Sequence, residues 1–91
     1  MPRAKMIREA AYEAQLMEIP SDKTVVRIEE TEDQIAVFPD MGSPLVRDAL
    51  VLRFGPNLRK IVVDGYVLIY RHDEDAVRML AAVPGKSVLY Q

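Results

Sequence analysis

The chain of 91 residues contains no cysteine, no tryptophan and only one histidine. The absence of cysteine excludes disulfide scaffolds, thiolate nucleophiles, Cys-ligated zinc and iron–sulfur clusters, and a reducing compartment fits, with the cytoplasm as the default. The four glycines form neither a G-x-G-x-x-G nor a G-x-x-x-x-G-K-[ST] pattern, so no phosphate-binding loop is predicted. We therefore expect no cofactor and no bound metal ion.

Long apolar runs are also missing. The longest purely apolar stretches, such as residues 67–70 and 79–83, are far shorter than the roughly 18 residues that span a bilayer. The first residues contain no apolar segment as long as that of a signal peptide. We expect neither secretion nor a membrane partner.

The size and composition are those of an ordinary globular domain. A chain of 10.3 kDa predicts one domain over residues 1–91, because a chain this short does not support two cores. Hydrophobic residues make up 49% of the sequence and charged residues 29%. A net charge of -2 is unfavourable for a protein devoted to nucleic acid.

Two helices are predicted in the first half of the chain. Apolar residues at helical spacing indicate a helix over 10–19, after a short strand over 4–8. Pro20 ends this helix, and Ser21 is a typical N-cap for a second helix over 22–38. The segment 45–54 has no clean periodicity, so we expect it to be irregular, with a short helical turn or the start of a strand as the regular alternatives.

Three strands are predicted in the second half. Asp64-Gly65 is a strong hairpin signal between strands over 58–63 and 66–71. A polar turn over 72–75 then leads to a third strand over 76–83. The order β-α-α-β-β-β predicts an α+β fold, a two-layer sandwich with two helices on one face of an antiparallel sheet.

The helical stripe and the strand faces together predict the core. Ile28, Ile35 and Phe38 should pack against the sheet, and Phe38 should be fully buried at the end of the second helix. The sheet residues expected opposite them are Val62, Leu68, Tyr70 and Leu80.

Charge is divided unevenly along the chain. Between residues 22 and 33, five carboxylates and two basic side chains give a local net charge of -3, which we interpret as a solvated helix face carrying Glu29, Glu30, Glu32 and Asp33. Between residues 45 and 60 the local net charge is +3. This basic stretch fits a solvated strand edge, or a site for phosphates or for an acidic protein segment. Its basic residues are Arg47, Arg53, Arg59 and Lys60.

Three motifs within residues 10–90 carry a resemblance to a known family. They are Phe38-Pro39-Asp40-Met41-Gly42, Asn57-Leu58-Arg59, and Tyr66-Val67-Leu68-Ile69-Tyr70-Arg71 before a charged turn. With these motifs the chain resembles the RelE/ParE superfamily of toxins from type II toxin-antitoxin systems, and within it the ParE-like plasmid stabilisation proteins of bacteria. The resemblance implies the β-α-α-β-β-β fold and a cytoplasmic toxin that is neutralised by a cognate antitoxin encoded next to it. A homodimer and a toxin-antitoxin hetero-oligomer are both compatible with it.

The resemblance leaves three functions open. ParE-like members bind DNA gyrase without hydrolytic chemistry of their own, whereas RelE-like members are endoribonucleases that cleave mRNA on the ribosome. The acidic pI favours the first, because contact with ribosomal RNA usually demands a basic protein. The third is a toxin-fold interaction protein without toxicity, because residues 83–86 stand where many ParE-like sequences carry an Arg-His pair. In a ribonuclease the catalytic groups would be Arg59, Arg71, Lys86 and Tyr90.

The charge division and the resemblance together predict where an antitoxin binds. We expect an extended or helical segment of the antitoxin to lie along the sheet and the helix pair. The partner-binding residues would be Arg53, Arg59 and Lys60.

Overall fold

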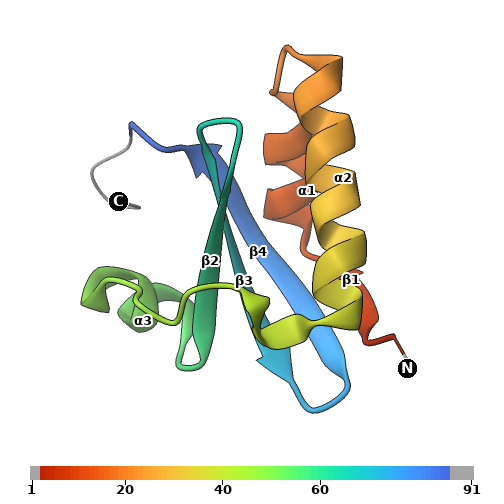
Figure 1. Ribbon diagram of the computed structural model, residues 1–91. Coiled ribbons are helices and arrows are strands. Elements are labelled where there is room, and N and C mark those ends of the chain that lie inside the picture. The colour runs from red at the N-terminus through yellow and green to blue at the C-terminus, as the bar shows by residue number, and fades with distance from the viewer. Residues whose placement is uncertain (1–2, 87–91) are drawn as a thin grey trace.

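The computed structural model describes residues 3–86, in which a four-stranded sheet carries helices on both faces (Figure 1). The α+β class and the predicted order of strands and long helices are confirmed, with one further helix before the second strand. In this part of the chain no helix has the length and apolar character needed to cross a bilayer. The elements are β1 (Lys5–Arg8), α1 (Ala10–Met17), α2 (Asp22–Val37), the 3-10 helix η1 (Pro39–Met41), α3 (Asp48–Phe54), β2 (Leu58–Val63), β3 (Tyr66–Asp73) and β4 (Ala76–Pro84).

The sheet has the strand order β1-β4-β3-β2. The strands β2, β3 and β4 form the predicted antiparallel meander, but β1 runs parallel to β4, with Lys5 opposite Ala76 and Arg8 opposite Met79. The expectation of a purely antiparallel sheet is therefore wrong for β1. No turn joins β1 to β4, so the local sequence carries no signal for their relative direction.

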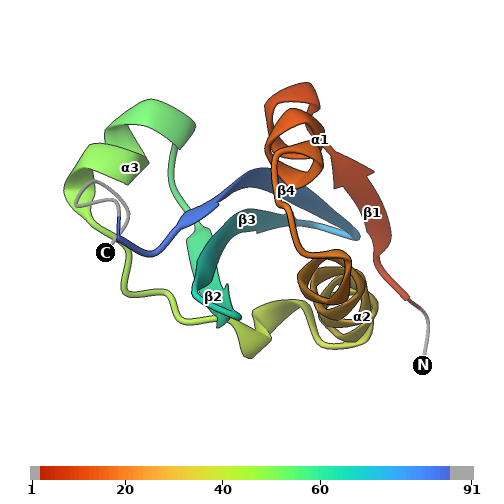
Figure 2. The same cartoon turned by 90° about the horizontal axis from the view of Figure 1, so that it is seen from above.

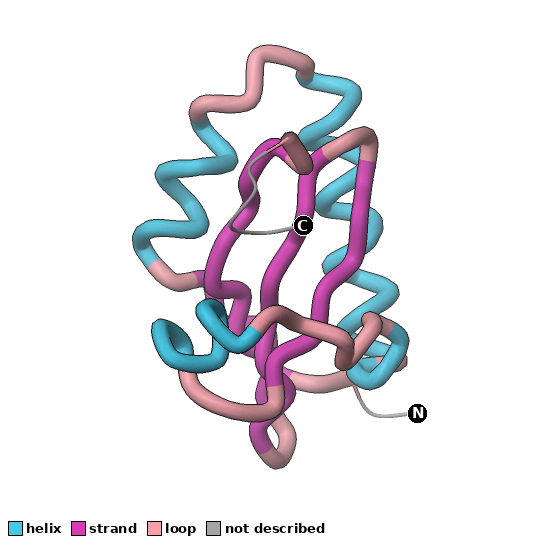
Figure 3. The backbone as a smooth tube through the Cα atoms, turned by 90° about the vertical axis from the view of Figure 1, so that its left-hand side faces the viewer, coloured by secondary structure: helices cyan, strands magenta, loops and turns pink. Residues whose placement is uncertain are grey.

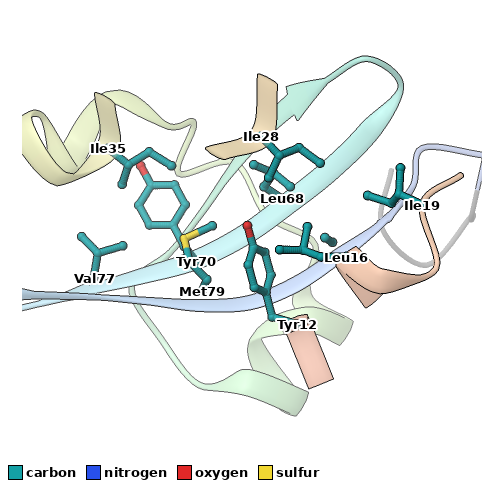
Figure 4. Close-up of a cluster of buried hydrophobic side chains, with 10 residues drawn as sticks. Tyr12, Leu16, Ile19, Ile28, Ile35, Leu68, Tyr70, Val77 and Met79 are labelled. Carbon is teal, nitrogen blue, oxygen red and sulfur yellow. The ribbon is translucent and has the colours of Figure 1, made fainter. Parts of the chain in front are cut away.

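The helices α1 and α2 pack side by side on one face of the sheet (Figure 2). The Oγ of Ser21 accepts a hydrogen bond from the backbone N–H of Thr24 at 3.3 Å, which confirms the predicted N-cap. Both helices end one or two residues earlier than predicted. The core beneath them contains Tyr12, Leu16, Ile19, Ile28, Ile35, Leu68, Tyr70, Val77, Met79 and Ala82 (Figure 4).

Phe38 is not part of this core. Its side chain is 59% exposed, which contradicts the predicted burial. The helix ends at Val37, and Phe38 adopts φ -126° and ψ 76°, so its side chain no longer follows the helical stripe. Ile28 and Ile35 are fully buried as predicted, so the register of α2 itself is correct.

Val62 and Leu80 lie on the opposite face of the sheet from the one predicted. Val62 pairs with Val67 and is 65% exposed. At Leu80 the register between β3 and β4 shifts, because Ile69 pairs with Ala81 while Tyr70 pairs with Met79. Leu80 is thus the extra residue of a β-bulge, and it is buried on the far side of the sheet.

The far face of the sheet is covered in part by α3, which lies near the start of β2 and the end of β3 (Figure 3). Residues 45–54 were expected to be irregular, because they lack a single apolar stripe, and α3 is the short helical turn that was one of the two alternatives. Leu50 is 1% exposed and packs into a second core with Leu58 and Ile69. Gly55 ends the helix with φ +92°, a conformation that side chains rarely adopt.

One carboxylate of α2, Glu32, is buried rather than solvated. It is 5% exposed, and its Oε2 accepts a hydrogen bond of 2.6 Å from the hydroxyl of Tyr12. Its Oε1 is paired with the guanidinium of Arg8. Burial, and then the bond to Glu32, raise the pKa of Tyr12 far above its ordinary value, so the hydroxyl stays a donor. Glu32 therefore links α2 to both α1 and β1.

We predict that Glu32→Ala lowers the free energy of unfolding by about 3 kcal/mol, because Arg8 and Tyr12 would lose their shared acceptor. The control Glu30→Ala, at an exposed position two residues earlier, should change the free energy by less than about 0.5 kcal/mol. Urea denaturation measures both values. Equal midpoints for the two variants would show that the buried carboxylate does not stabilise the fold.

Candidate functional site

The loop after α2 is attached to the sheet by the hydroxyl of Tyr70. This hydroxyl donates to the carbonyl of Pro39 at 2.7 Å and accepts from the backbone N–H of Gly42 at 2.9 Å. A Cβ at Gly42 would lie 2.6 Å from the hydroxyl oxygen, so only glycine allows this approach. Burial raises the pKa of Tyr70 and keeps the hydroxyl protonated. The Phe-Pro-x-x-Gly motif is thus a loop shaped to fit one tyrosine.

Arg59, at the start of β2, holds the same loop from a second side. Its Nη1 donates to the carbonyls of Asp40 and Gly42 at 3.0 and 2.7 Å. The carboxylate of Asp40 lies 3.5 Å from the Nε of Arg59 and 3.0 Å from the Nδ1 of His72. The hydrogen bond with His72 is the main cause of a lowered pKa at Asp40. This corner gathers an acid, a base and a guanidinium, and the carboxylate of Asp40 binds both of the other two groups.

The loop continues along the outer edge of β2, where it leaves part of the strand open. Ser43 and Lys60 exchange two backbone hydrogen bonds, each 2.9 Å long. Since outward-pointing backbone groups recur at every second residue of an edge strand, the N–H and C=O of Val62 also point outward. Within residues 3–86 they have no hydrogen-bond partner. This open position can accept a short extended segment of another chain.

A groove of about 860 Å³ lies beside this open edge, between α2 and β2. Val26, Met41 and Val62 line it, and they are 50%, 45% and 65% exposed. Arg27, also in the lining, forms an ion pair of 3.2 Å with Asp64 in the hairpin turn. The groove thus combines exposed apolar side chains, charged flanks and free backbone groups, which is the chemistry of a peptide-binding surface rather than of a closed catalytic pocket.

The three residues expected to bind a partner do not form one patch. Arg53 lies on α3, where its guanidinium is 5.2 Å from the ring centre of Phe54. Arg59 pairs with Tyr70, so its side chain points to the face of the sheet that α1 and α2 cover. Lys60 is the next residue of β2, so its side chain points to the opposite face, which carries α3. Arg53 and Lys60 therefore lie on one side of the sheet, whereas Arg59 is bound to the loop on the other.

The residues expected in a ribonuclease are also not brought together. Arg71 follows Tyr70 in β3 and points to the opposite face from Arg59; its Nη1 donates to the carbonyl of Phe54 at 2.8 Å and its Nε to Asp73 at 2.6 Å. Lys86 follows the end of β4, where Gly85 bonds to Gly65 at the hairpin turn. Arg71 lies five residue steps along β3 from Tyr66, so roughly 16 Å separate it from that turn. Tyr90 lies outside the described residues.

Sequence reasoning missed the pair Asp40–His72 and the open position at Val62. His72 was placed in a polar turn, but it is the seventh residue of β3 and only 26% of its side chain is exposed. The signal available in the sequence was the spacing of two residues between Tyr70 and His72, because residues two apart in a strand point to the same face of the sheet. The open edge at Val62 had no local signal, since it depends on where the loop joins β2.

The pair Asp40–His72 makes a prediction about pH. His72→Ala should raise the pKa of Asp40 toward its ordinary value of 3.8, because the main stabiliser of the carboxylate is removed. In the native chain the pKa is lowered by folding, so this contribution to stability is complete above 3.8 and is lost as the pH falls through the lowered pKa. Carbon-13 NMR titration of the carboxyl groups measures the shift. A titration of Asp40 that is the same in His72→Ala and in the control Glu74→Ala would contradict it.

The motifs can now be compared with known proteins. The family model described as the ParE toxin of the type II toxin-antitoxin system, parDE, matches residues 3–87. No curated protein matches the sequence. Because the match covers nearly the whole chain and includes the tyrosine-bound loop, the chain belongs to the ParE toxin family of type II toxin-antitoxin systems.

Proposed function

We propose that this type II toxin acts by binding DNA gyrase and that a cognate antitoxin neutralises it. The observation that supports binding over RNA cleavage is the placement of Arg59 and Arg71 on opposite faces of the sheet. Each is already bound to backbone carbonyls, Arg59 to the loop and Arg71 to the end of α3. General acid-base cleavage of RNA needs such groups around one phosphate. The proposal implies that the toxin acts in the cytoplasm.

The target of the toxin can be tested directly. Purified protein should inhibit the supercoiling of plasmid DNA by gyrase and should leave mRNA on translating ribosomes uncut. Agarose gels and primer extension measure the two outcomes. Codon-spaced cuts without gyrase inhibition would favour the ribonuclease, and no effect in either assay would favour an interaction protein without toxicity.

The groove between α2 and β2 is the surface we propose for an extended segment of the antitoxin. It lies along β2 and along α2, one helix of the pair, and it offers the N–H and C=O of Val62 to an added strand. Lys60 lies next to this position in β2 and brings a positive charge to the far side of the strand. An acidic segment would gain both backbone hydrogen bonds and favourable electrostatics there.

We predict that Val62→Pro weakens binding of the product of the adjoining reading frame by about tenfold, because proline removes the outward N–H. An edge strand tolerates this change, since the lost N–H does not bond to β3. The control Val62→Thr keeps the N–H and a β-branched side chain, so its dissociation constant should stay within about twofold of the native value. Isothermal titration calorimetry measures both constants. Equal affinities for the two variants would exclude strand addition at β2.

A further inference from the structure

The strand β1 forms the second edge of the sheet, at the opposite end from β2 (Figure 2). The backbone N–H groups of Lys5 and Glu9 donate to carbonyls in and just before β4, at 2.9 and 3.0 Å. Because the direction of the backbone groups alternates along a strand, the N–H and C=O groups of Met6 and Arg8 point away from β4. Within residues 3–86 these outward groups have no backbone hydrogen-bond partner. A row of such groups is a template for a further strand.

The extended segment Lys5–Glu9 is complementary to itself. Glu9 continues the extended backbone of β1, with φ -70° and ψ 151°, before α1 begins. The segment therefore carries a positive charge at its first residue and a negative charge at its last, with Ile7 at its centre. When two such segments pair antiparallel about Ile7, each Lys5 lies opposite the Glu9 of the other copy. Opposite charges directly across a strand pair stabilise it, so the segment favours a second copy of itself.

Only one register satisfies both the backbone and the side chains. In the pairing about Ile7, Met6 of one copy lies opposite Arg8 of the other, and the two residues exchange their outward backbone groups. A shift of one residue sets outward groups against inward ones, so no ladder forms. A shift of two residues in one direction places Arg8 opposite Arg8, which are like charges. The same shift in the other direction requires the N–H of Ala4, which already donates to the carbonyl of Ala36 at 2.7 Å.

Apolar side chains meet at the centre of this pairing. Ile7 is partly exposed and belongs to neither of the two hydrophobic clusters. It points to the face away from α1 and α2, because its neighbour Met6 packs against the core beneath them. The two Ile7 residues would form a pair without backbone hydrogen bonds between them, the class in which side chains lie closest. A second copy would thus cover an isoleucine that the fold of one chain leaves partly open.

Most charged side chains near this edge already have partners. The ion pairs on and beside β1 are Arg3–Asp33, Arg8–Glu29, Arg8–Glu32, Arg78–Glu9 and, one strand further in, Arg71–Asp73. Lys5 is exposed and has no ion-pair partner among the described residues, and the same holds for the carboxylates of Glu13 and Asp75 nearby. In the pairing about Ile7, Glu9 would lie between Arg78 of its own chain and Lys5 of the other. No like charges lie directly opposite each other in this register.

We propose that β1 is the interface of a symmetric dimer, in which the segments Lys5–Glu9 of two copies pair antiparallel about Ile7 and join two sheets into one. Two-fold pairing of a surface with itself is the commonest way in which identical chains associate. The segment is short, so the buried area is small and the two copies associate weakly, in the micromolar range. The dimer does not depend on the proposed function. It keeps β2 at the outer end of each sheet, where the groove beside α2 stays open for an antitoxin.

Sedimentation velocity of the full chain alone, over increasing concentration, tests the association. Lys5→Glu should raise the dissociation constant of the dimer at least about tenfold, because two opposite-charge pairs become two like-charge pairs. Glu9→Lys should have the same effect with two pairs of lysines. The matched control is Lys23→Glu at an exposed position of α2, and its dissociation constant should stay within about twofold of the native value.

An equimolar mixture of the two charge variants separates a specific contact from a loss of structure. In the mixed pair, the acidic ends of the Lys5→Glu chain lie opposite the basic ends of the Glu9→Lys chain. The mixture should therefore form a heterodimer with a dissociation constant within about threefold of the native value, although each variant alone is monomeric. The melting temperatures of both variants should stay close to that of the native chain, because both positions lie at the surface.

Cross-linking tests the register. The native chain has no cysteine, so a single introduced cysteine can form a disulfide only between two copies. In the pairing about Ile7, the two α-carbons of that residue would lie roughly 4.5 Å apart, within the range of about 4.4–6.8 Å that a disulfide spans. Ile7→Cys should therefore give a covalent dimer on mild oxidation, seen on a non-reducing gel. Lys5→Cys should give far less, because its two copies would lie roughly 13 Å apart.

Two results would overturn the proposal. One is a native chain that stays monomeric at millimolar concentration, with Ile7→Cys cross-linking no faster than Lys5→Cys. The other is a dimer that both charge variants leave unchanged, because such a dimer would use another surface. Neither result bears on the supercoiling assay, so the proposed function is tested separately.

Discussion

Tyr70 connects the core of the protein to the open edge of β2. Its ring is buried beneath α1 and α2, and its hydroxyl holds the loop through Pro39 and Gly42. That attachment directs the next residue, Ser43, onto the edge of β2, where it covers Lys60. The position of the loop thus determines which backbone groups of β2 stay open. The form of the groove beside α2 therefore depends on the hydroxyl at the end of the buried Tyr70 side chain.

The two faces of the sheet have different roles. On one face, α1 and α2 cover a core in which the buried carboxylate of Glu32 accepts hydrogen bonds from Tyr12 and Arg8. On the other side, α3 covers the sheet only in part and exposes leucines of its own. Residual apolar surface therefore collects around α3 and along the edge of β2. This division keeps the exposed apolar surface separate from the main core.

The charged groups near the loop are used for structure. Asp40 binds both Arg59 and His72, Arg59 also binds the loop backbone, and Arg71 caps α3. Satisfying the backbone in this way stabilises irregular segments that have few hydrogen bonds of their own. Lys60 and Arg53 lie on the side of the sheet that carries α3. Some basic side chains of this acidic protein thus support the loop and α3 from within, and others lie on the side of the sheet that carries α3.

The sequence by itself determined what depends on neighbours along the chain. The N-cap at Ser21, the hairpin at Asp64-Gly65 and the burial of Ile28 and Ile35 all follow from local spacing, because helices and tight turns are made within a few residues. The motif Phe38-Pro39-Asp40-Met41-Gly42 also identified the family, although its geometric reason became visible only with Tyr70 in place.

Only the tertiary structure decided what depends on residues far apart in the chain. The parallel direction of β1, the bulge at Leu80 and the open edge at Val62 are set by which segments meet, and no local pattern encodes that. The burial of Glu32 depends in the same way on Arg8 and Tyr12, which lie 24 and 20 residues away. A charge is buried only where distant donors converge on it, so its place in the core is a property of the assembled fold.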